Sequence, residues 1–248
     1  MDLGLRGRTA IVCGASSGLG LAAAEALAEE GANVTMFARR REQLELDAGR
    51  IGALAVRGDV TNTADLERLV AKTLEAFGGI DVVVWNSGGP PAGKAADVSD
   101  EALERAFELL LAPAVRLVRA CLPHLERSGA GRIIAITSLT VQEPTAHLAL
   151  SNALRPGLVG WLKTLSREVG PKGVTVNCVA PGRIDTPRLT ELYGEGGPPA
   201  EQLEQIPLGR LGTPREFGDV VCFLASARAA YVSGTTVLVD GGLSRALL

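Results

Sequence analysis

Short apolar runs rich in β-branched residues alternate along the chain with longer stretches whose apolar residues recur at helical spacing. The strand-like runs are Thr9–Gly14, Asn33–Ala38, Ala53–Val60, Asp81–Asn86, Arg132–Ser138, Val174–Ala180 and Thr235–Gly242. The helical stretches are Gly20–Glu30, Ala64–Phe77, Asp100–Arg127, Leu148–Val169 and Pro214–Leu224. This order predicts repeated βαβ units around one parallel sheet of about seven strands, and the near-continuously apolar strands indicate helices on both faces.

The chain has no internal repeat, low-complexity tract or linker, so the pattern favours a single α/β domain over residues 1–248. One long stretch rich in glycine, proline and polar residues interrupts the pattern late in the chain, at Thr186–Pro207. Such an insertion is typical of a mobile lid over a ligand, and an inert surface excursion is the alternative.

Composition narrows the class of partner. Hydrophobic residues make up 46% of the 248 residues, which is enough for a large core, and the formal net charge is only −3. Because no run of like charges occurs, nucleic acid and anionic membrane surfaces are poor partners, and a small molecule is favoured. The N-terminus has no charged leader followed by an apolar segment, and no stretch reaches the ~18 to 20 apolar residues of a membrane span, so we expect a soluble, cytoplasmic protein.

The four cysteines lie far apart without metal-ligand spacing, at Cys13, Cys121, Cys178 and Cys222. This distribution predicts reduced thiols, no disulfide framework and no metal site.

A glycine-rich turn follows the first strand, where "CGASSGLG" carries Gly14, Gly18 and Gly20 into an amphipathic helix. Glycines at such a turn let the backbone approach a pyrophosphate, which then lies at the positive end of the helix. The spacing is G-x-x-x-G-x-G rather than G-x-G-x-x-G, and a tight structural turn is the alternative.

The end of the second strand bears on the type of dinucleotide. The run "VTMFARRR" ends in Arg39, Arg40 and Arg41 with no acidic residue. A carboxylate there would bind the ribose 2′-hydroxyl of NAD, whereas guanidinium groups bind the 2′-phosphate of NADP. The sequence therefore favours NADP, with NAD still open; a solvated basic helix start is the structural alternative.

Together these motifs resemble those of the short-chain dehydrogenase/reductase family, and particularly of 3-oxoacyl-acyl-carrier-protein reductases. The glycine-rich turn is joined by "GDV" at 58–60, "NSGG" at 86–89, "ITS" at 136–138, "APG" at 180–182 and the tail "PLGRLGTPREFGDVVCFLASARAAYVSGTTVLVDGG". The resemblance covers the whole chain in colinear order. It implies a Rossmann sheet with a nicotinamide dinucleotide across the strand ends, and hydride transfer between that cofactor and a carbonyl or alcohol.

The resemblance also implies roles for matching positions. Ser16, Ser17 and Leu19 would line the phosphates and a ribose, together with Gly14, Gly18 and Gly20. Asp59 and Val60 would contact the adenine, and Asn86, Ser87 and Gly88 the adenosine ribose. Pro181, Gly182, Ile184 and Thr186 would flank the nicotinamide. The structural alternatives are that Asp59 simply ends a strand, that Asn86 braces neighbouring strands and that "VDGG" is architectural.

The catalytic positions depart from the family pattern. In the family a serine orients the substrate oxygen, a tyrosine about thirteen residues later exchanges the proton, and a lysine four residues further holds the ribose. Ser138 matches the serine, but the tyrosine and lysine positions fall on Ser151 and Arg155. A fourth family residue, an asparagine, falls at Leu110. The opposing interpretation is purely structural: Ser151 bonds a carbonyl one turn earlier and Arg155 makes an ion pair.

The replacements limit the chemistry. An alkyl hydroxyl ionises far less readily than a phenol, so Ser151 needs a relay to act as a proton donor. Arg155 can still hold a ribose and supply charge, but it stays protonated. Pro156 and Gly157 follow at mid-helix and predict a kink there.

Two other side chains are candidates for the proton. His147 lies one turn before Ser151 and titrates near neutral pH, although it can equally be an exposed or capping residue. Tyr193 lies in the expected lid, where a packing role is the alternative. Lys163 is two turns beyond Arg155, too far along the helix to replace the family lysine.

Two functions are therefore open. The first is an NADP-dependent oxidoreductase for a small carbonyl or alcohol, with Ser138 orienting and Ser151 and Arg155 as a divergent pair. The second is a redox-inactive dinucleotide-binding sensor or oligomer partner. We favour the enzyme, with its substrate set by the lid and the loop at 139–147. The resemblance implies a homotetramer paired through the helices at 100–127 and 148–169, and the apolar content of residues 102–122 is consistent with that contact.

Overall fold

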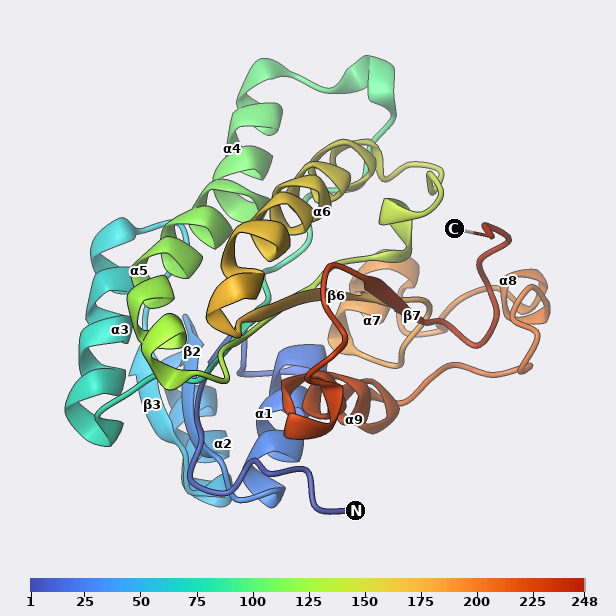
Figure 1. Cartoon of the computed structure of the whole chain (residues 1–248). Helices are drawn as coiled ribbons and strands as arrows, with labels where there is room; N and C mark the ends of the chain where they lie inside the picture. The colour runs from blue at the N-terminus through green and yellow to red at the C-terminus, as the bar shows by residue number, and fades with distance from the viewer. Residues whose placement is uncertain (248) are drawn as a thin grey trace.

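In a computed structural model that describes residues 1–247, seven parallel strands form one sheet in the order β3-β2-β1-β4-β5-β6-β7 (Figure 1). The strands are β1 (Thr9–Cys13), β2 (Asn33–Ala38), β3 (Leu54–Arg57), β4 (Val82–Trp85), β5 (Arg132–Ile136), β6 (Thr175–Pro181) and β7 (Thr236–Val239). The expected doubly wound Rossmann sheet is confirmed. Its order reverses between β1 and β4, and ligands of such sheets bind at the carboxyl ends of the strands at this point.

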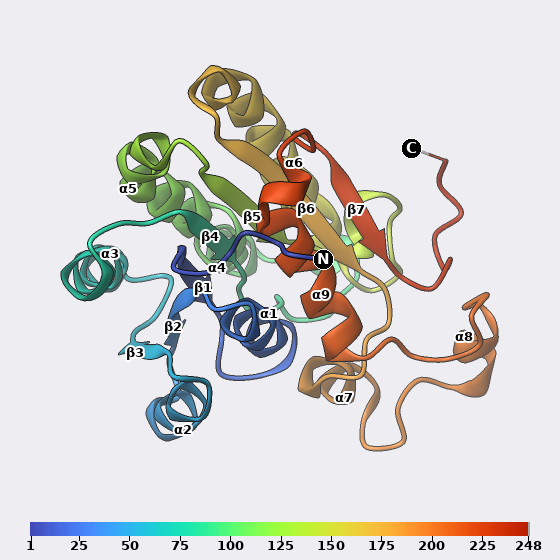
Figure 2. The same ribbon diagram turned by 60° about the horizontal axis from the view of Figure 1, so that its bottom comes forward.

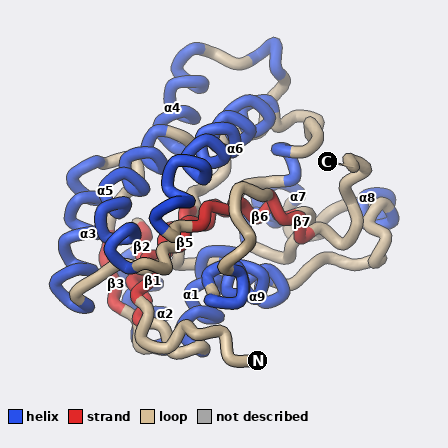
Figure 3. The backbone as a smooth tube through the Cα atoms, in the orientation of Figure 1, coloured by secondary structure: helices blue, strands red, loops and turns tan. Residues whose placement is uncertain are grey.

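Helices cover both faces of the sheet, as Figures 2 and 3 show. One face packs against α1 (Gly18–Glu29), α2 (Arg41–Ile51) and α9 (Pro214–Ala225), and the other against α3 (Thr63–Phe77), α5 (Ala112–Ser128) and α6 (Ala149–Val169). Strand residues alternate between the two cores: Val12 belongs to the first and Ile11 to the second. Burial on both faces accounts for the continuous apolar runs.

The helix expected over Asp100–Arg127 is in fact two helices. The first, α4 (Asp100–Leu110), ends at Leu111, and α5 begins with Pro113 in its first turn. Proline has no N–H with which to continue a helix ladder, and it is tolerated in the first turn, so the chain restarts there. The 3-10 turn η1 (Ala95–Asp97) precedes α4.

Pro156, at which the sequence predicts a kink, does not end the helix, because α6 runs from Ala149 to Val169 with the proline inside it. The apolar side chains of Leu150, Leu158, Leu162 and Leu165 are buried along it. This packing along 21 residues offsets the hydrogen bond that the proline removes, worth ~3 kcal/mol together with its steric clash. The register of Ser151 and Arg155 on one face is therefore kept.

The stretch Thr186–Pro207 is not structureless. It holds two short helices, α7 (Pro187–Tyr193) and α8 (Ala200–Glu204), which lie beside the carboxyl end of the sheet (Figure 1). The remaining single turns are η2 (Leu139–Val141), η3 (Gly170–Lys172) and η4 (Ala227–Ala229).

The four cysteines are free and buried. Burial raises the pKa of the Cys121 thiol to about 12 and raises that of Cys13 further, so these thiols stay protonated. No group of metal-ligating side chains forms among residues 1–247. None of the helices described there is both long and apolar enough to cross a membrane.

Candidate functional site

The glycine-rich turn requires its glycines for close packing. Gly14 has φ +60°, and a Cβ there would lie 2.6 Å from Nδ2 of Asn86. A Cβ at Gly20 would overlap the carbonyl oxygen of Gly14. The Asn86 amide donates to that same oxygen at 3.4 Å. Asn86 therefore braces the end of β4 against the turn after β1, which is the structural role weighed for it.

The same turn leaves backbone N–H groups at the start of α1 without a side-chain cap. Ser17 occupies the N-cap position, and its side chain makes no capping hydrogen bond. The first N–H groups of a helix have no partner within it, and the helix dipole makes this end partially positive. A Cβ at Gly18 would meet the side chains of Thr186, at 3.5 Å, and Pro187, at 4.0 Å, which places the start of α7 over the turn. The arrangement fits a pyrophosphate on α1.

Two arginines lie at the end of β2, as expected. Arg40 donates from Nη2 to the carbonyl oxygen of Ser16 at 3.0 Å and to its hydroxyl at 3.3 Å, so it ties β2 to the glycine-rich turn. Arg39 is exposed and lies 3.9 Å from Asp59. Arg41 starts α2 and pairs with Glu45, away from the other two.

Arg39 and Asp59 line a pocket of about 400 Å³. Arg57 and Arg68 line it as well, and sequence reasoning assigned neither of them to the site. Arg57 ends β3 and donates to the carbonyl oxygen of Arg39 at 3.4 Å, whereas Arg68 pairs with Asp65. Asp59 accepts from the backbone and hydroxyl of Thr61. Val60 packs against the α3 side of the core. The pocket combines three guanidinium groups with the carboxylates of Asp59 and Asp65, which lie beside Arg39 and Arg68 and partly neutralise the charge that could hold a phosphate.

Ser138 caps η2 just beyond β5, and its hydroxyl accepts from the backbone N–H of Thr140 at 3.2 Å. The Thr140 hydroxyl in turn lies 3.1 Å from that of Ser151. Both Thr140 and Ser151 are buried. Ser151 therefore pairs with a hydroxyl rather than with a carbonyl one turn earlier. Thr140, which sequence reasoning missed, links the Ser138 turn to the helix that carries Ser151.

Arg155 is buried one turn beyond Ser151 and has no ionic partner among the residues of the structure. Its Nη1 donates to the carbonyl oxygens of Ile136 and Thr137, at 3.4 and 3.1 Å, and its Nε has no hydrogen-bond partner. Burial, and then the nearby charge of Arg188, lower the pKa of Arg155 to about 10, so it stays protonated at neutral pH. The ion pair weighed for Arg155 is therefore wrong.

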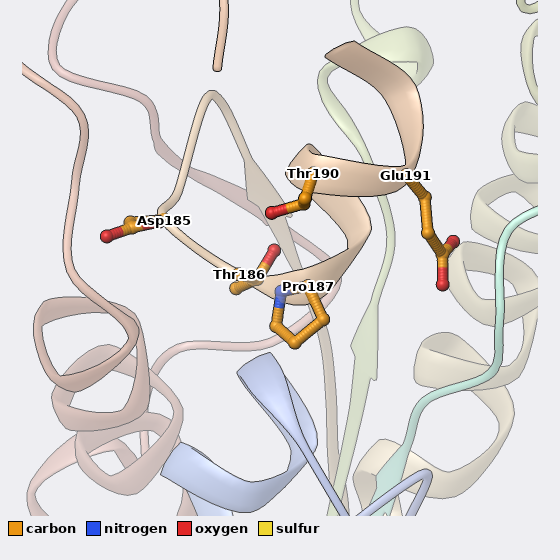
Figure 4. Close-up of a pocket in the computed structure, with 5 residues that line it drawn as sticks. All are labelled: Asp185, Thr186, Pro187, Thr190 and Glu191. Carbon is orange, nitrogen blue, oxygen red and sulfur yellow. The ribbon is translucent and has the colours of Figure 1, made fainter. Parts of the chain in front are cut away.

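The segment after β6 lies at the same carboxyl end of the sheet. Gly182 lies so close to Asp240 that a Cβ would come within 2.6 Å of its Cβ. Ile184 is buried and bridges to Gly212, and Thr186 occupies the N-cap position of α7 without a side-chain capping hydrogen bond. Asp185, Thr186, Pro187, Thr190 and Glu191 line an open pocket of about 510 Å³, with the two carboxylates at its opposite ends (Figure 4).

The remaining candidates are placed as follows. Ser87 bonds only its neighbour Gly88 at 3.3 Å, and a Cβ at Gly88 would meet nothing, so this stretch leaves open space. His147 is exposed, with φ +60°. Tyr193 ends α7 and is half-buried. Lys163 donates to the Gly234 carbonyl at 2.6 Å, away from Arg155, as its distance along α6 predicted.

The fold and this site define a Rossmann-type dinucleotide-binding protein with a serine just beyond the end of β5. Comparison with known proteins identifies the family. Residues 14–244 match the family model described as enoyl-(acyl carrier protein) reductase. The chain is 36% identical over 243 residues to the 3-oxoacyl-[acyl-carrier-protein] reductase FabG of Vibrio cholerae, covering 97% of this chain and 99% of that one. It is 33% identical over 244 residues to dehydrogenase/reductase SDR family member 4 of Oryctolagus cuniculus, covering 96% and 94%. The chain belongs to the short-chain dehydrogenase/reductase family.

Solved structures agree with this assignment. L-sorbose reductase from Gluconobacter frateurii, complexed with NADPH and L-sorbose, superposes with a TM-score of 0.92 at 33% identity, over all of both chains. YwfH, an NADPH-dependent reductase involved in bacilysin biosynthesis, has the same TM-score at 25% identity, with coverage of 97% and 99%.

Proposed function

We propose that this protein is an NADP(H)-dependent oxidoreductase that acts on a small carbonyl or alcohol through an atypical set of catalytic residues. The observation that carries the proposal is Arg155, a buried guanidinium whose Nε has no hydrogen-bond partner, one turn from Ser151 on the helix beside the Ser138 turn. A structural arginine of that depth would have its donors satisfied, whereas a ligand-binding one keeps donors for the ligand.

The residues at the strand ends fit a nicotinamide dinucleotide. The uncapped start of α1 would hold the pyrophosphate, with Ser16, Ser17 and Leu19 beside it. Asp59, Val60 and the Asn86–Gly88 stretch would hold the adenosine. Pro181, Gly182, Ile184 and Thr186 would border the nicotinamide, and Arg155 the nearby ribose. When bound, the cofactor supplies or accepts the hydride of the redox step.

The proton path must run through groups other than a phenol. Ser138 would orient the substrate oxygen, and Ser151 would give its proton to that oxygen as the hydride arrives; the Thr140 hydroxyl, 3.1 Å away, would return a proton to Ser151 and regain one from solvent water. Arg155 would stabilise negative charge on the oxygen without giving up its own proton. His147 and Tyr193 remain candidate donors only when the loop at 139–147 or α7 moves, because neither forms a side-chain hydrogen bond with Ser138 or Ser151.

The preference for NADP over NAD is proposed to reside in Arg39 and Arg40. NADPH should bind more tightly than NADH, because a charge-assisted hydrogen bond to the 2′-phosphate is worth ~1.5 to 3 kcal/mol, or about tenfold or more in affinity. Arg39→Ala should reduce this preference by about tenfold. Titration of both cofactors into wild type, Arg39→Ala and the control Arg41→Ala measures it. Equal affinities in wild type, or an equal loss in both variants, would contradict the assignment.

The second candidate function is a redox-inactive sensor that keeps the dinucleotide site. The buried Thr140–Ser151 hydroxyl pair supports it, because a hydroxyl already engaged at 3.1 Å is a weak replacement for a free phenol. The two functions separate in one experiment, in which NADPH deuterated at C4 is incubated with a panel of 3-oxoacyl thioesters, ketoses and oxo acids. Deuterium in a carbinol product supports the reductase, and NADPH binding without transfer to any member supports the sensor.

We further propose that residues 1–248 act as one domain, with 186–207 as a lid. The position of Thr186 supports this, because its side chain would lie 3.5 Å from a Cβ at Gly18, so the start of α7 lies over the glycine-rich turn. Arg183 Nη2 donates to Gln202 of α8 at 3.2 Å, which ties the second lid helix to the end of β6.

Assembly as a homotetramer is supported by exposed apolar side chains on α4. Leu103 and Phe107 lie one turn apart there and are 44% and 42% exposed. Pairing between subunits through α4, α5 and α6 would remove both from water. Sedimentation at micromolar concentration should therefore give a tetramer, and Phe107→Glu should shift it to smaller species. A monomeric wild type would rule this assembly out.

A further inference from the structure

Arginine side chains gather where the edge strand β3 ends beside β2. The parallel register pairs Ala38 of β2 with Arg57, the last residue of β3, and the N–H of Gly58 donates to the Ala38 carbonyl oxygen at 3.0 Å. Arg57 donates from Nε to the carbonyl oxygen of Arg39 at 3.4 Å. Both arginines line the pocket of about 400 Å³ at this corner of the sheet, and Arg68 of α3 lines it from the other side of the β3 end.

The two carboxylates of this pocket are already engaged, but to different degrees. Asp65 accepts from Nη1 of Arg68 at 2.6 Å and from the backbone N–H of Asp59 at 2.8 Å. Asp59 accepts from the backbone and the hydroxyl of Thr61, at 3.0 and 2.9 Å. It lies 3.9 Å from Arg39, whose side chain is 75% exposed. Asp65 therefore balances the charge of Arg68 at hydrogen-bonding distance, whereas the ion pair of Asp59 with Arg39 is long and open to water, and such a pair is weak.

Arg57 supplies the positive charge that the pocket does not balance. Its guanidinium forms no salt bridge with any carboxylate of residues 1–247. Three guanidinium groups against two carboxylates leave one positive charge in excess. Arg40, the other arginine at this strand end, already donates from Nη2 to the carbonyl oxygen and the hydroxyl of Ser16. Arg57 therefore has more capacity left for an anionic ligand than Arg40 has.

We propose that Arg57 is a specificity-determining residue for the dinucleotide and binds the 2′-phosphate together with Arg39. A phosphate monoester carries about two negative charges near neutral pH and has three acceptor oxygens, so it can accept from two guanidinium groups at once. The ribose 2′-hydroxyl of NADH offers no negative charge and leaves Arg57 without a partner. This inference rests on the NADP(H) preference of the proposed function and adds a residue of β3 to the arginines that follow β2.

The test compares two probes that lack the nicotinamide and differ only in the 2′-phosphate, ADP-ribose and 2′-phospho-ADP-ribose. Calorimetric titration into the wild type should give at least tenfold tighter binding of the phosphorylated probe. Arg57→Gln should weaken that probe by about tenfold, the scale of one lost charge-assisted hydrogen bond, and leave ADP-ribose unchanged. Arg57→Lys should recover part of the loss, because it keeps the charge but not the planar fork. Arg41→Gln removes an arginine that pairs with Glu45 at the start of α2, and this matched control should change neither affinity.

A double-mutant cycle separates direct binding by Arg57 from an effect through Arg39. In the Arg39→Ala background, Arg57→Gln should still weaken 2′-phospho-ADP-ribose several-fold, and no further loss there would show that Arg57 acts only through Arg39, which overturns the inference. An unchanged affinity in Arg57→Gln, or an equal loss for both probes, would also overturn it, while a wild type that prefers the phosphorylated probe keeps the NADP(H) preference standing. A wild type that does not distinguish the two probes would instead contradict the proposed function in its choice of cofactor.

Discussion

The double change Ser151→Tyr with Arg155→Lys is expected to raise the rate of NADPH-dependent carbonyl reduction by ~10² to 10⁴, the usual contribution of a positioned general acid. The change restores a phenol and an ammonium four residues apart on α6, which is unbroken through Pro156. Because Thr140 connects the Ser138 turn to Ser151, a phenol at 151 would start from the same side of the cleft as Ser138.

Two features hold the gain toward the lower end of that range. Ser151 is buried beside Thr140, so the larger ring must project into the cleft rather than occupy the serine's place. The family asparagine is absent, since Leu110 is a buried apolar residue at the end of α4.

The matched control is Ser151→Phe with Arg155→Lys, which carries the ring without the hydroxyl. Steady-state NADPH oxidation with simple 3-oxoacyl substrates should rise only in the tyrosine variant. A folded tyrosine variant that binds NADPH and is no faster than the phenylalanine variant would count against the placement of Ser151. A wild type that already turns over rapidly would instead show that "SNALR" is a working replacement for the usual pair.

Arg155→Met is expected to change stability and function in opposite directions. Burial of a charge without a counter-ion is costly, so an apolar side chain of similar length should stabilise the ligand-free protein. The variant also loses the hydrogen bonds to the Ile136 and Thr137 carbonyls, and the net gain in the free energy of unfolding should be ~1 kcal/mol or more. For a chain of this size that corresponds to a rise in Tm of ~2 to 4 °C. NADPH affinity should fall about tenfold or more, since the ribose loses its charged donor.

Thermal unfolding without cofactor and NADPH titration measure the two effects. A fall in Tm with unchanged NADPH affinity would contradict this interpretation. Arg155 would then be a structural residue that hydrogen-bonds the carbonyl groups at the end of β5, and not a ligand-binding residue. Arg167→Met on the exposed part of α6 controls for the effect of methionine on the helix.

Much of the fold followed from periodicity, because a sheet covered on both faces leaves long apolar runs such as Val82–Trp85 that polar turns interrupt. The glycine-rich turn was also predictable, since Gly14 and Gly20 stand where a Cβ has no room. The break at Leu111 was missed because the apolar spacing continues across it. Pro113 was the available signal, as proline in a first turn marks a helix start.

The sequence positions of the candidate site residues could be predicted, but the contacts between their side chains could not. Ser138, Ser151 and Arg155 could be aligned by spacing, yet only the folded chain brings Thr140 between the two serines. Arg188 was missed because its hydrogen bond to the Pro90 carbonyl joins residues 98 positions apart and forms only in the folded chain. Arg57 was missed because the parallel register of β2 and β3, which pairs Ala38 with Arg57, decides its place.

The central claim is that Ser138, Ser151 and Arg155 take the substrate-orienting, proton-donor and ribose-holding positions of an NADP(H) site. A crystal structure of the NADP⁺ complex tests it most directly. We predict Arg155 hydrogen-bonded to the nicotinamide ribose, the 2′-phosphate beside Arg39 and Arg40, and the Ser138 hydroxyl facing the nicotinamide ring. A bound cofactor whose nicotinamide ribose makes no contact with Arg155, or whose ring lies away from Ser138, would contradict the account.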